Sequence, residues 1–188
     1  LIFGTGVTNI KINNTYFNRI HDYYNLVFPD DTVFLESSDN FEHKKPRAFK
    51  NTYYYDYMEI MSVLRSKFVT HVDEKTAEEI DNFIEFLNKN FAIEFDYAFY
   101  ETIKNSLIKV GKRLSYMKSY FLKLLDRIQP KIVFLEDAHY GGQSYMIKWA
   151  KEMGIVTAEF QHGIVSKEHL AYNYGEGVRN SEEYKKYV

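Results

Sequence analysis

The stretch that decides the fold is Lys131-Ile-Val-Phe-Leu-Glu-Asp-Ala-His-Tyr-Gly-Gly142, taken together with Ile155-Val-Thr-Ala-Glu-Phe-Gln-His-Gly163. Each begins with an apolar run of strand length and ends in polar residues and glycine. Residues 143–153 between them have the pattern of one helix, and Gly154 stands where a left-handed residue would end it. Because such a crossover is right-handed, we expect the two strands to be parallel in one sheet.

The sheet is expected to extend beyond this unit. Residues 1–3, 32–36 and 52–55 have the apolar or β-prone composition of three further strands. Helices are predicted over residues 14–27, 56–68 and 97–128, and over a segment that begins with a capping box formed by Thr76 and Glu79. In the longest helix the apolar residues recur in alternating steps of four and three, which indicates a helix packed on a helix.

The predicted fold class is therefore α/β, a Rossmann-like parallel sheet with flanking helices and a long helical pair. We expect residues 1–175 to form this domain, with a helical insertion at about residues 70–128. Residues 176–188 are expected to begin an interdomain linker. The chain starts at a leucine rather than a methionine, so it is expected to be a piece of a longer protein whose second domain is absent.

Composition excludes several classes of protein. The 188 residues contain no cysteine, which rules out a disulfide scaffold and a zinc site made of thiolates. The net charge of −2 does not favour nucleic acid as a partner. No apolar run approaches the roughly 20 residues of a membrane span. The 17 tyrosines and 15 phenylalanines have two interpretations, an AT-rich genome or aromatic platforms for sugars, and composition does not separate them.

Polar side chains follow both strands of the crossover unit, where ligands bind in parallel sheets. Glu136, Asp137 and His139 follow the first strand, and Glu159, Gln161 and His162 follow the second. An imidazole at a strand tip can act as a general base at neutral pH, so His162 is a candidate catalytic residue. Neighbouring strand residues point to opposite faces, so at most one of Glu136 and Asp137 enters such a site. For each of these residues the alternative is a structural or solvated polar group.

Other segments suggest anion binding, each with a simpler interpretation. Gly141-Gly142 precedes a helix whose free amides can bind phosphate, and Gly4-x-Gly6 is a weaker hint of the same kind, but a tight turn explains both. The basic cluster formed by residues 43–47 and Lys50 is either a phosphate contact or solvated surface. The lysines of the 97–128 helix are either solvated or in contact with an anionic membrane. No Asp-x-Asp pair suggests a metal site.

A resemblance to a known family appears in Glu159-Phe-Gln-His-Gly-Ile-Val-Ser-Lys-Glu-His-Leu-Ala-Tyr-Asn-Tyr174. This stretch resembles the Gln-His-Gly…Tyr segment of bacterial surface-polysaccharide glycosyltransferases of the two-domain GT-B type. It is more remotely similar to the Trp-His-Gly segment of teichoic-acid glycerophosphotransferases. The resemblance covers residues 130–175 well and the first 130 residues only in general layout.

The resemblance implies roles for individual residues. It places His162 as a catalytic base or acceptor-site histidine, with Glu136 or Asp137 orienting it or binding acceptor hydroxyls. Further cleft and substrate-binding residues would be Gln161, Gly163, His139, Tyr140, Gly141, Gly142 and Tyr172.

The expected function is metal-independent transfer of a sugar from a nucleotide sugar to a surface-glycan or lipid-linked acceptor, in capsule polysaccharide biosynthesis at the bacterial cell envelope. No cofactor is expected. GT-B enzymes bind the nucleotide-sugar donor mainly through the carboxy-terminal half, so residues 1–188 alone are expected to be inactive. The expected location is cytoplasmic, with peripheral contact to the inner face of the membrane. The alternative from a different class is a non-catalytic Rossmann-like ligand-binding module.

Overall fold

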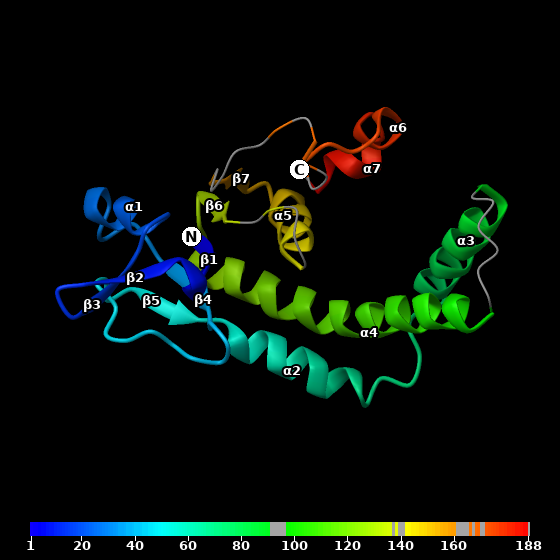
Figure 1. Cartoon of the computed structure of the whole chain (residues 1–188), viewed down its shortest axis with the longest axis horizontal. Helices are drawn as coiled ribbons and strands as arrows, with labels where there is room; N and C mark the ends of the chain where they lie inside the picture. Colours follow the sequence, from blue (N-terminus) through cyan, green and yellow to red (C-terminus); the bar gives the residue numbers. More distant parts are fainter. Residues whose placement is uncertain are drawn as a thin grey trace. The chain divides into compact units, whose positions relative to one another are not determined.

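The structure is a computed structural model that describes residues 1–90, 97–136, 138, 142–160, 166, 168–169 and 172–187. The chain divides into two compact units. The first comprises residues 1–56 and 121–188, and the second comprises residues 57–120. Figure 1 labels the helices and strands.

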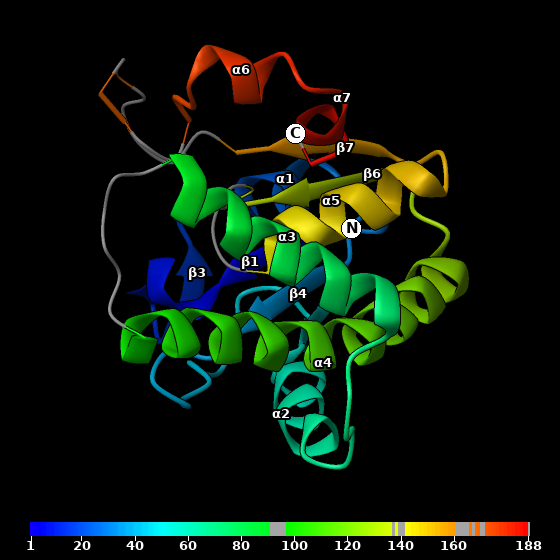
Figure 2. The same ribbon diagram turned by 90° about the vertical axis from the view of Figure 1, so that its right-hand side faces the viewer.

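The first unit is built on a five-stranded parallel sheet. Its strands are β1 (Ile2–Thr5), β4 (Phe34–Ser37), β5 (Thr52–Tyr54), β6 (Ile132–Leu135) and β7 (Val156–Glu159). The order across the sheet is β5-β4-β1-β6-β7, and Figure 2 shows β7, β6, β1 and β4 side by side in this order. All neighbouring pairs are parallel. The prediction of an α/β protein with a parallel sheet is confirmed, and the topology is consistent with a Rossmann-like fold.

The crossover unit of the opening stretch is also confirmed. Helix α5 (Gln143–Glu152) connects β6 to β7, and Gly154 follows it with φ of +73°, the left-handed geometry expected of a helix terminator. The remaining elements of this unit are short: η1 (Gly6–Thr8), β2 (Asn9–Ile12), β3 (Thr15–Asn18), α1 (Asp22–Val27), α6 (Glu176–Arg179) and α7 (Glu182–Lys185).

The helix predicted over residues 14–27 is wrong for its first half. Residues 9–18 form an antiparallel hairpin, and only residues 22–27 are helical. The reason lies at Asn13 and Asn14, which have φ of 47° and 65°. Two successive left-handed residues make the turn that matches the twist of a hairpin, and asparagine tolerates this conformation better than most residues.

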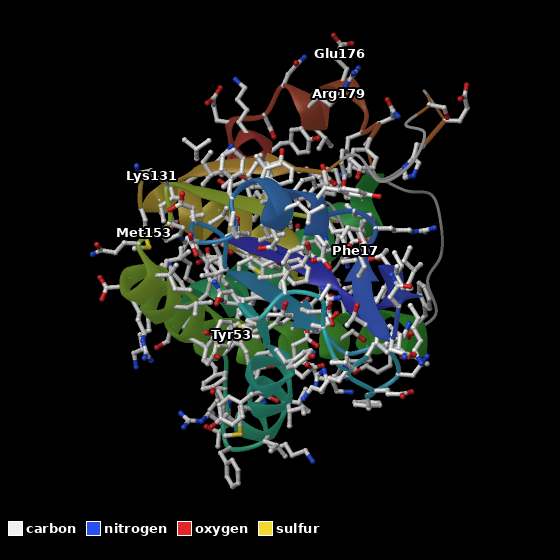
Figure 3. All side chains as sticks on the ribbon, turned by 90° about the vertical axis from the view of Figure 1, so that its left-hand side faces the viewer. Phe17, Tyr53, Lys131, Met153, Glu176 and Arg179 are labelled. Carbon is white, nitrogen blue, oxygen red and sulfur yellow. The ribbon has the colours of Figure 1, made fainter. Side chains whose placement is uncertain are left out.

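Apolar side chains cover both faces of the sheet. On one face Phe3 packs against Tyr55 and Phe121, with ring centroids 5.8 and 5.5 Å apart, and Phe121 contacts Trp149 of α5. On the other face Tyr24 of α1 packs against Phe134, with centroids 5.2 Å apart. In Figure 3, Lys131, the residue before β6, lies on the left and Phe17 of the hairpin lies on the right.

The second unit is helical, and polar side chains connect its helices. It contains most of α2 (Asp56–Ser66), all of α3 (Glu74–Asn90) and α4 (Tyr97–Ile128) up to residue 120. Arg113 Nε of α4 donates a hydrogen bond to Ser62 Oγ of α2 over 3.1 Å, and Lys104 Nζ lies 2.5 Å from Asp81 of α3.

The amino end of α3 differs from its prediction. The predicted capping hydroxyl of Thr76 instead donates to Asp73 Oδ2, and the Thr76 N–H donates to Asp73 Oδ1. The helix begins at Glu74, because an Asp carboxylate placed ahead of it accepts both of these donors. In α3 the side chains of Ile80 and Ile84 are buried, whereas Phe83 is exposed.

Candidate functional site

The carboxyl edge of the sheet is the place where the topology favours a site. The strands that follow β1 in the chain first add on one side of it, as β4 and β5, and then on the other, as β6 and β7. The gap between β1 and β6 is therefore the topological switch point, outside which ligands bind in open α/β sheets. Thr5 at the end of β1 and Glu136 directly after β6 lie at this point.

Glu136 makes two buried contacts at the switch point. The Thr5 N–H donates a hydrogen bond to Glu136 Oε2 over 3.0 Å, and His21 Nε2 lies 3.1 Å from the same oxygen. Glu136 is 2% exposed and His21 is 0% exposed. The carboxylate thus faces a histidine that precedes α1, and it is not open to solvent at this position.

Gly4 makes room for the imidazole. In the sheet register Gly4 pairs with Glu36 of β4, and on its other side the Glu136 N–H donates to Phe3 O. A Cβ atom added to Gly4 would lie 2.0 Å from His21 Cε1 and 2.6 Å from His21 Nε2. The imidazole therefore occupies the slot that a glycine leaves between two glutamates on neighbouring strands.

A second ion cluster adjoins the first. Arg47 Nη2 lies 3.1 Å from Asp22 Oδ2, and Arg47 Nε lies 3.3 Å from Glu36 Oε2. Asn9 Nδ2 donates to Glu36 Oε2 over 2.9 Å, and the Asn18 N–H donates to Asp22. Burial raises the pKa of Asp22 and also that of Glu36, and the Arg47 guanidinium opposes both changes.

These two clusters position the chain around the carboxyl edge rather than receive a ligand. Asp22, Glu36 and His21 are fully buried, so no solute reaches them. Their contacts instead tie the hairpin, the start of α1 and the segment that carries Arg47 to the ends of β1, β4 and β6. Removing one partner of such a buried ion pair lowers the free energy of unfolding, so these contacts fix the geometry of this edge.

The end of β7 carries a partly exposed polar contact. Glu159 Oε1 accepts hydrogen bonds from the Ala138 N–H over 2.9 Å and from the Tyr172 hydroxyl over 2.5 Å. The Phe160 N–H donates to Leu135 O, and the Phe160 ring packs on Phe134 with centroids 4.8 Å apart. Residues on both sides of the stretch 161–171 are thus attached to the ends of β6 and β7.

The predicted site residues fall into two groups. Glu136, Gly142 and Tyr172 are described, and Glu136 and Tyr172 both lie at the carboxyl edge. Gly142 is the residue before α5 and makes no side-chain cap. The other predicted residues lie outside the described residues: Asp137, His139, Tyr140, Gly141, Gln161, His162 and Gly163.

The sequence pattern indicated Arg47 only as part of the basic cluster of residues 43–47, and it did not indicate His21, Asp22 or Glu36. One signal was available, because Val-Phe-Leu-Glu occurs twice, at residues 33–36 and at residues 133–136. This repeat marks two strands that each end in a glutamate, and the sheet order places them on either side of the strand that contains Gly4. Nothing in the sequence indicates that His21 fills that position, since it comes from a turn.

Comparison with known proteins gives no relative for this chain: no family model, no curated protein and no solved structure matches it. Among the described residues, no three His, Asp or Glu side chains gather in a way that could hold a metal ion. In the same part of the chain, no helix is long and apolar enough to cross a membrane. The fold and the edge define an α/β protein with a parallel sheet.

Proposed function

We propose that this chain is the amino-terminal α/β domain of a GT-B-type glycosyltransferase, which transfers a sugar from a nucleotide sugar to a surface-glycan or lipid-linked acceptor. The observation that carries the proposal is the hydrogen bond from Tyr172 to Glu159, together with that from Phe160 to Leu135. These contacts attach the two sides of the stretch that contains Gln161-His162-Gly163 to the carboxyl ends of parallel strands. That is the edge at which α/β proteins bind ligands.

His162 is proposed to act as the general base. It takes the proton of an acceptor hydroxyl while the hydroxyl oxygen forms a bond to the anomeric carbon of the donor sugar. The bond from that carbon to the donor phosphate breaks, and the nucleotide leaves with the bonding electrons. A general base of this kind typically contributes about 10²–10⁴-fold in rate.

Glu136 and Asp137 are proposed to have different roles. Glu136 is committed to Thr5 and His21, so its proposed role is to hold the edge in shape. This leaves Asp137 as the member of the pair that would orient His162 or bind acceptor hydroxyls. Tyr172 is proposed to line the acceptor side, with its hydroxyl held by Glu159.

The second candidate is a non-catalytic ligand-binding module, and one observation favours it. The described ionisable groups at the switch point, Glu136 and His21, are buried against each other rather than presented to a substrate. A module needs only a shaped edge, whereas an enzyme also needs a titratable group that reaches the substrate.

The experiment that separates the two is a donor survey on the protein expressed from its whole gene. The protein is incubated with a panel of UDP-, GDP- and CMP-linked sugars, with and without extracted lipid-linked glycans, and nucleotide release is measured. Acceptor-dependent release from one donor supports the transferase. A folded protein that releases no nucleotide from any donor, with or without acceptor, contradicts it. Residues 1–188 alone are expected to give no turnover.

A further inference from the structure

The basic cluster of the sequence, residues 43–47 with Lys50, is mostly neutralised in the structure. His43 Nε2 lies 3.6 Å from Asp56, Lys44 Nζ lies 2.7 Å from Asp39, and Arg47 is held by Asp22 and Glu36. Lys45 and Lys50 differ from these three. Within the described part of the chain, neither has a carboxylate at ion-pairing distance.

These two lysines line one open groove beside the edge strand β5. The groove has a volume of about 590 Å³, and it contains no acidic residue in its lining. Arg47, Phe49 and Tyr54 contribute to its walls, and Lys45 Nζ lies 5.0 Å from the centroid of the Tyr54 ring. Tyr53, the strand residue between Thr52 and Tyr54, is labelled in Figure 3 and marks where this edge lies.

The charges and the shape indicate what such a groove accepts. Two ammonium groups without a carboxylate partner favour an anion, and lysine binds phosphate as a point charge. Phe49 and Pro46 give the groove an apolar wall against which the rest of a ligand can pack.

We propose that this groove binds a phosphate ester, with Lys45 and Lys50 contacting the phosphate and the wall formed by Pro46 and Phe49 contacting the group attached to it. The ester has two sources that share this chemistry, a soluble sugar phosphate and the phosphate headgroup of a lipid. The proposal stands on the groove alone and does not depend on sugar transfer at the carboxyl edge.

The test uses residues 1–188 and two kinds of probe. Glucose 1-phosphate is titrated by calorimetry, and vesicles of phosphatidylcholine with or without phosphatidylglycerol are tested by cosedimentation. The double variant Lys45→Gln/Lys50→Gln is compared with Lys75→Gln, which alters an exposed lysine in α3 whose side chain is 84% exposed. Fluorescence of the single tryptophan, Trp149, checks that each variant is folded.

The expected result is binding that the double variant weakens by at least about tenfold, that Lys75→Gln leaves unchanged, and that added salt weakens. Binding of glucose 1-phosphate supports a soluble ester, and binding only of phosphatidylglycerol vesicles supports a lipid headgroup. Absence of binding to both probes overturns the proposal. Equal binding by the folded double variant and the wild type also overturns it.

Discussion

Substitution of Gly4 by alanine tests the described part of the site most sharply. The added Cβ would lie 2.0 Å from His21 Cε1, whereas carbon atoms in contact are normally about 3.5–4.0 Å apart. The imidazole must therefore retreat by roughly 1.5 Å or more. It is enclosed by Phe34 and Phe160, with ring centroids 4.7 and 5.3 Å away. Gly4→Ala thus forces a buried ring against other buried rings.

The magnitude follows from two effects. Overpacking a core costs about 1–3 kcal/mol. Displacing His21 from Glu136 leaves a buried carboxylate without this partner, which costs about 1–3 kcal/mol more. Alanine restricts the unfolded chain and offsets about 0.4–1 kcal/mol. We therefore expect Gly4→Ala to lower the free energy of unfolding by about 1–5.6 kcal/mol.

The assay is urea denaturation followed by the fluorescence of Trp149, which is buried in the same unit as Gly4. The matched control is Gly177→Ala in α6, where no atom lies within 4 Å of the added carbon. This control should be neutral or stabilise by up to about 1 kcal/mol.

A double-mutant cycle with His21→Ala identifies the clash itself. Removing the imidazole gives the new Cβ room, so Gly4→Ala should cost much less in the His21→Ala background, with a coupling energy of about 1–3 kcal/mol. A Gly4→Ala protein within about 0.5 kcal/mol of wild type would refute the packing described at the switch point. The same packing would be refuted if the stability losses of Gly4→Ala and His21→Ala were additive in the double variant.

Three further predictions concern the same edge. Glu136→Gln keeps an acceptor for the Thr5 N–H but replaces the carboxylate oxygen that faces His21. It should lower the free energy of unfolding by about 1–3 kcal/mol in the same urea assay. An unchanged urea midpoint would contradict the contact between Glu136 and His21. Tyr172→Phe loses the hydrogen bond to Glu159 and should cost about 0.5–1.5 kcal/mol, against no cost for Tyr53→Phe on the exposed side of β5. Burial raises the pKa of Asp22 above its ordinary value of 3.8, so the folded state binds the Asp22 proton more tightly than the unfolded state does. The contribution of Asp22 to the free energy of unfolding therefore falls as pH rises from 3.8 to the raised pKa. In thermal melts, Asp22→Asn should therefore lower the melting temperature relative to wild type more at about pH 4 than at about pH 7. A larger loss at pH 7 would mean that the attraction of Asp22 to Arg47 outweighs the effect of burial on its pKa.

The sequence predicts the sheet well because its signals are local. Each strand of the sheet is a short apolar or β-prone run, and Gly154 marks the end of a helix through its backbone geometry alone. The hairpin at residues 9–18 was missed because Tyr16 and Phe17 also fit a helical spacing, and the left-handed geometry at Asn13 and Asn14 decided between the two.

The buried clusters were harder to predict, because they join residues far apart in the chain. Glu136 was singled out as a possible catalytic group, yet its partner His21 is 115 positions earlier and comes from a turn. Arg47 was expected in a surface cluster, but Asp22 and Glu36 draw its side chain to 5% exposure. Only the three-dimensional register reveals that Gly4 leaves the slot on which this arrangement depends.

The proposed transferase activity is tested most directly by His162→Ala in the protein expressed from its whole gene. The thermal midpoint and the single-turnover rate of sugar transfer are measured on the same preparation. If His162 is the general base, the rate should fall by about 10²–10⁴-fold, while stability changes by no more than about 1 kcal/mol. A variant that melts early yet transfers sugar at nearly the wild-type rate while folded would contradict the account and would remove His162 from the mechanism.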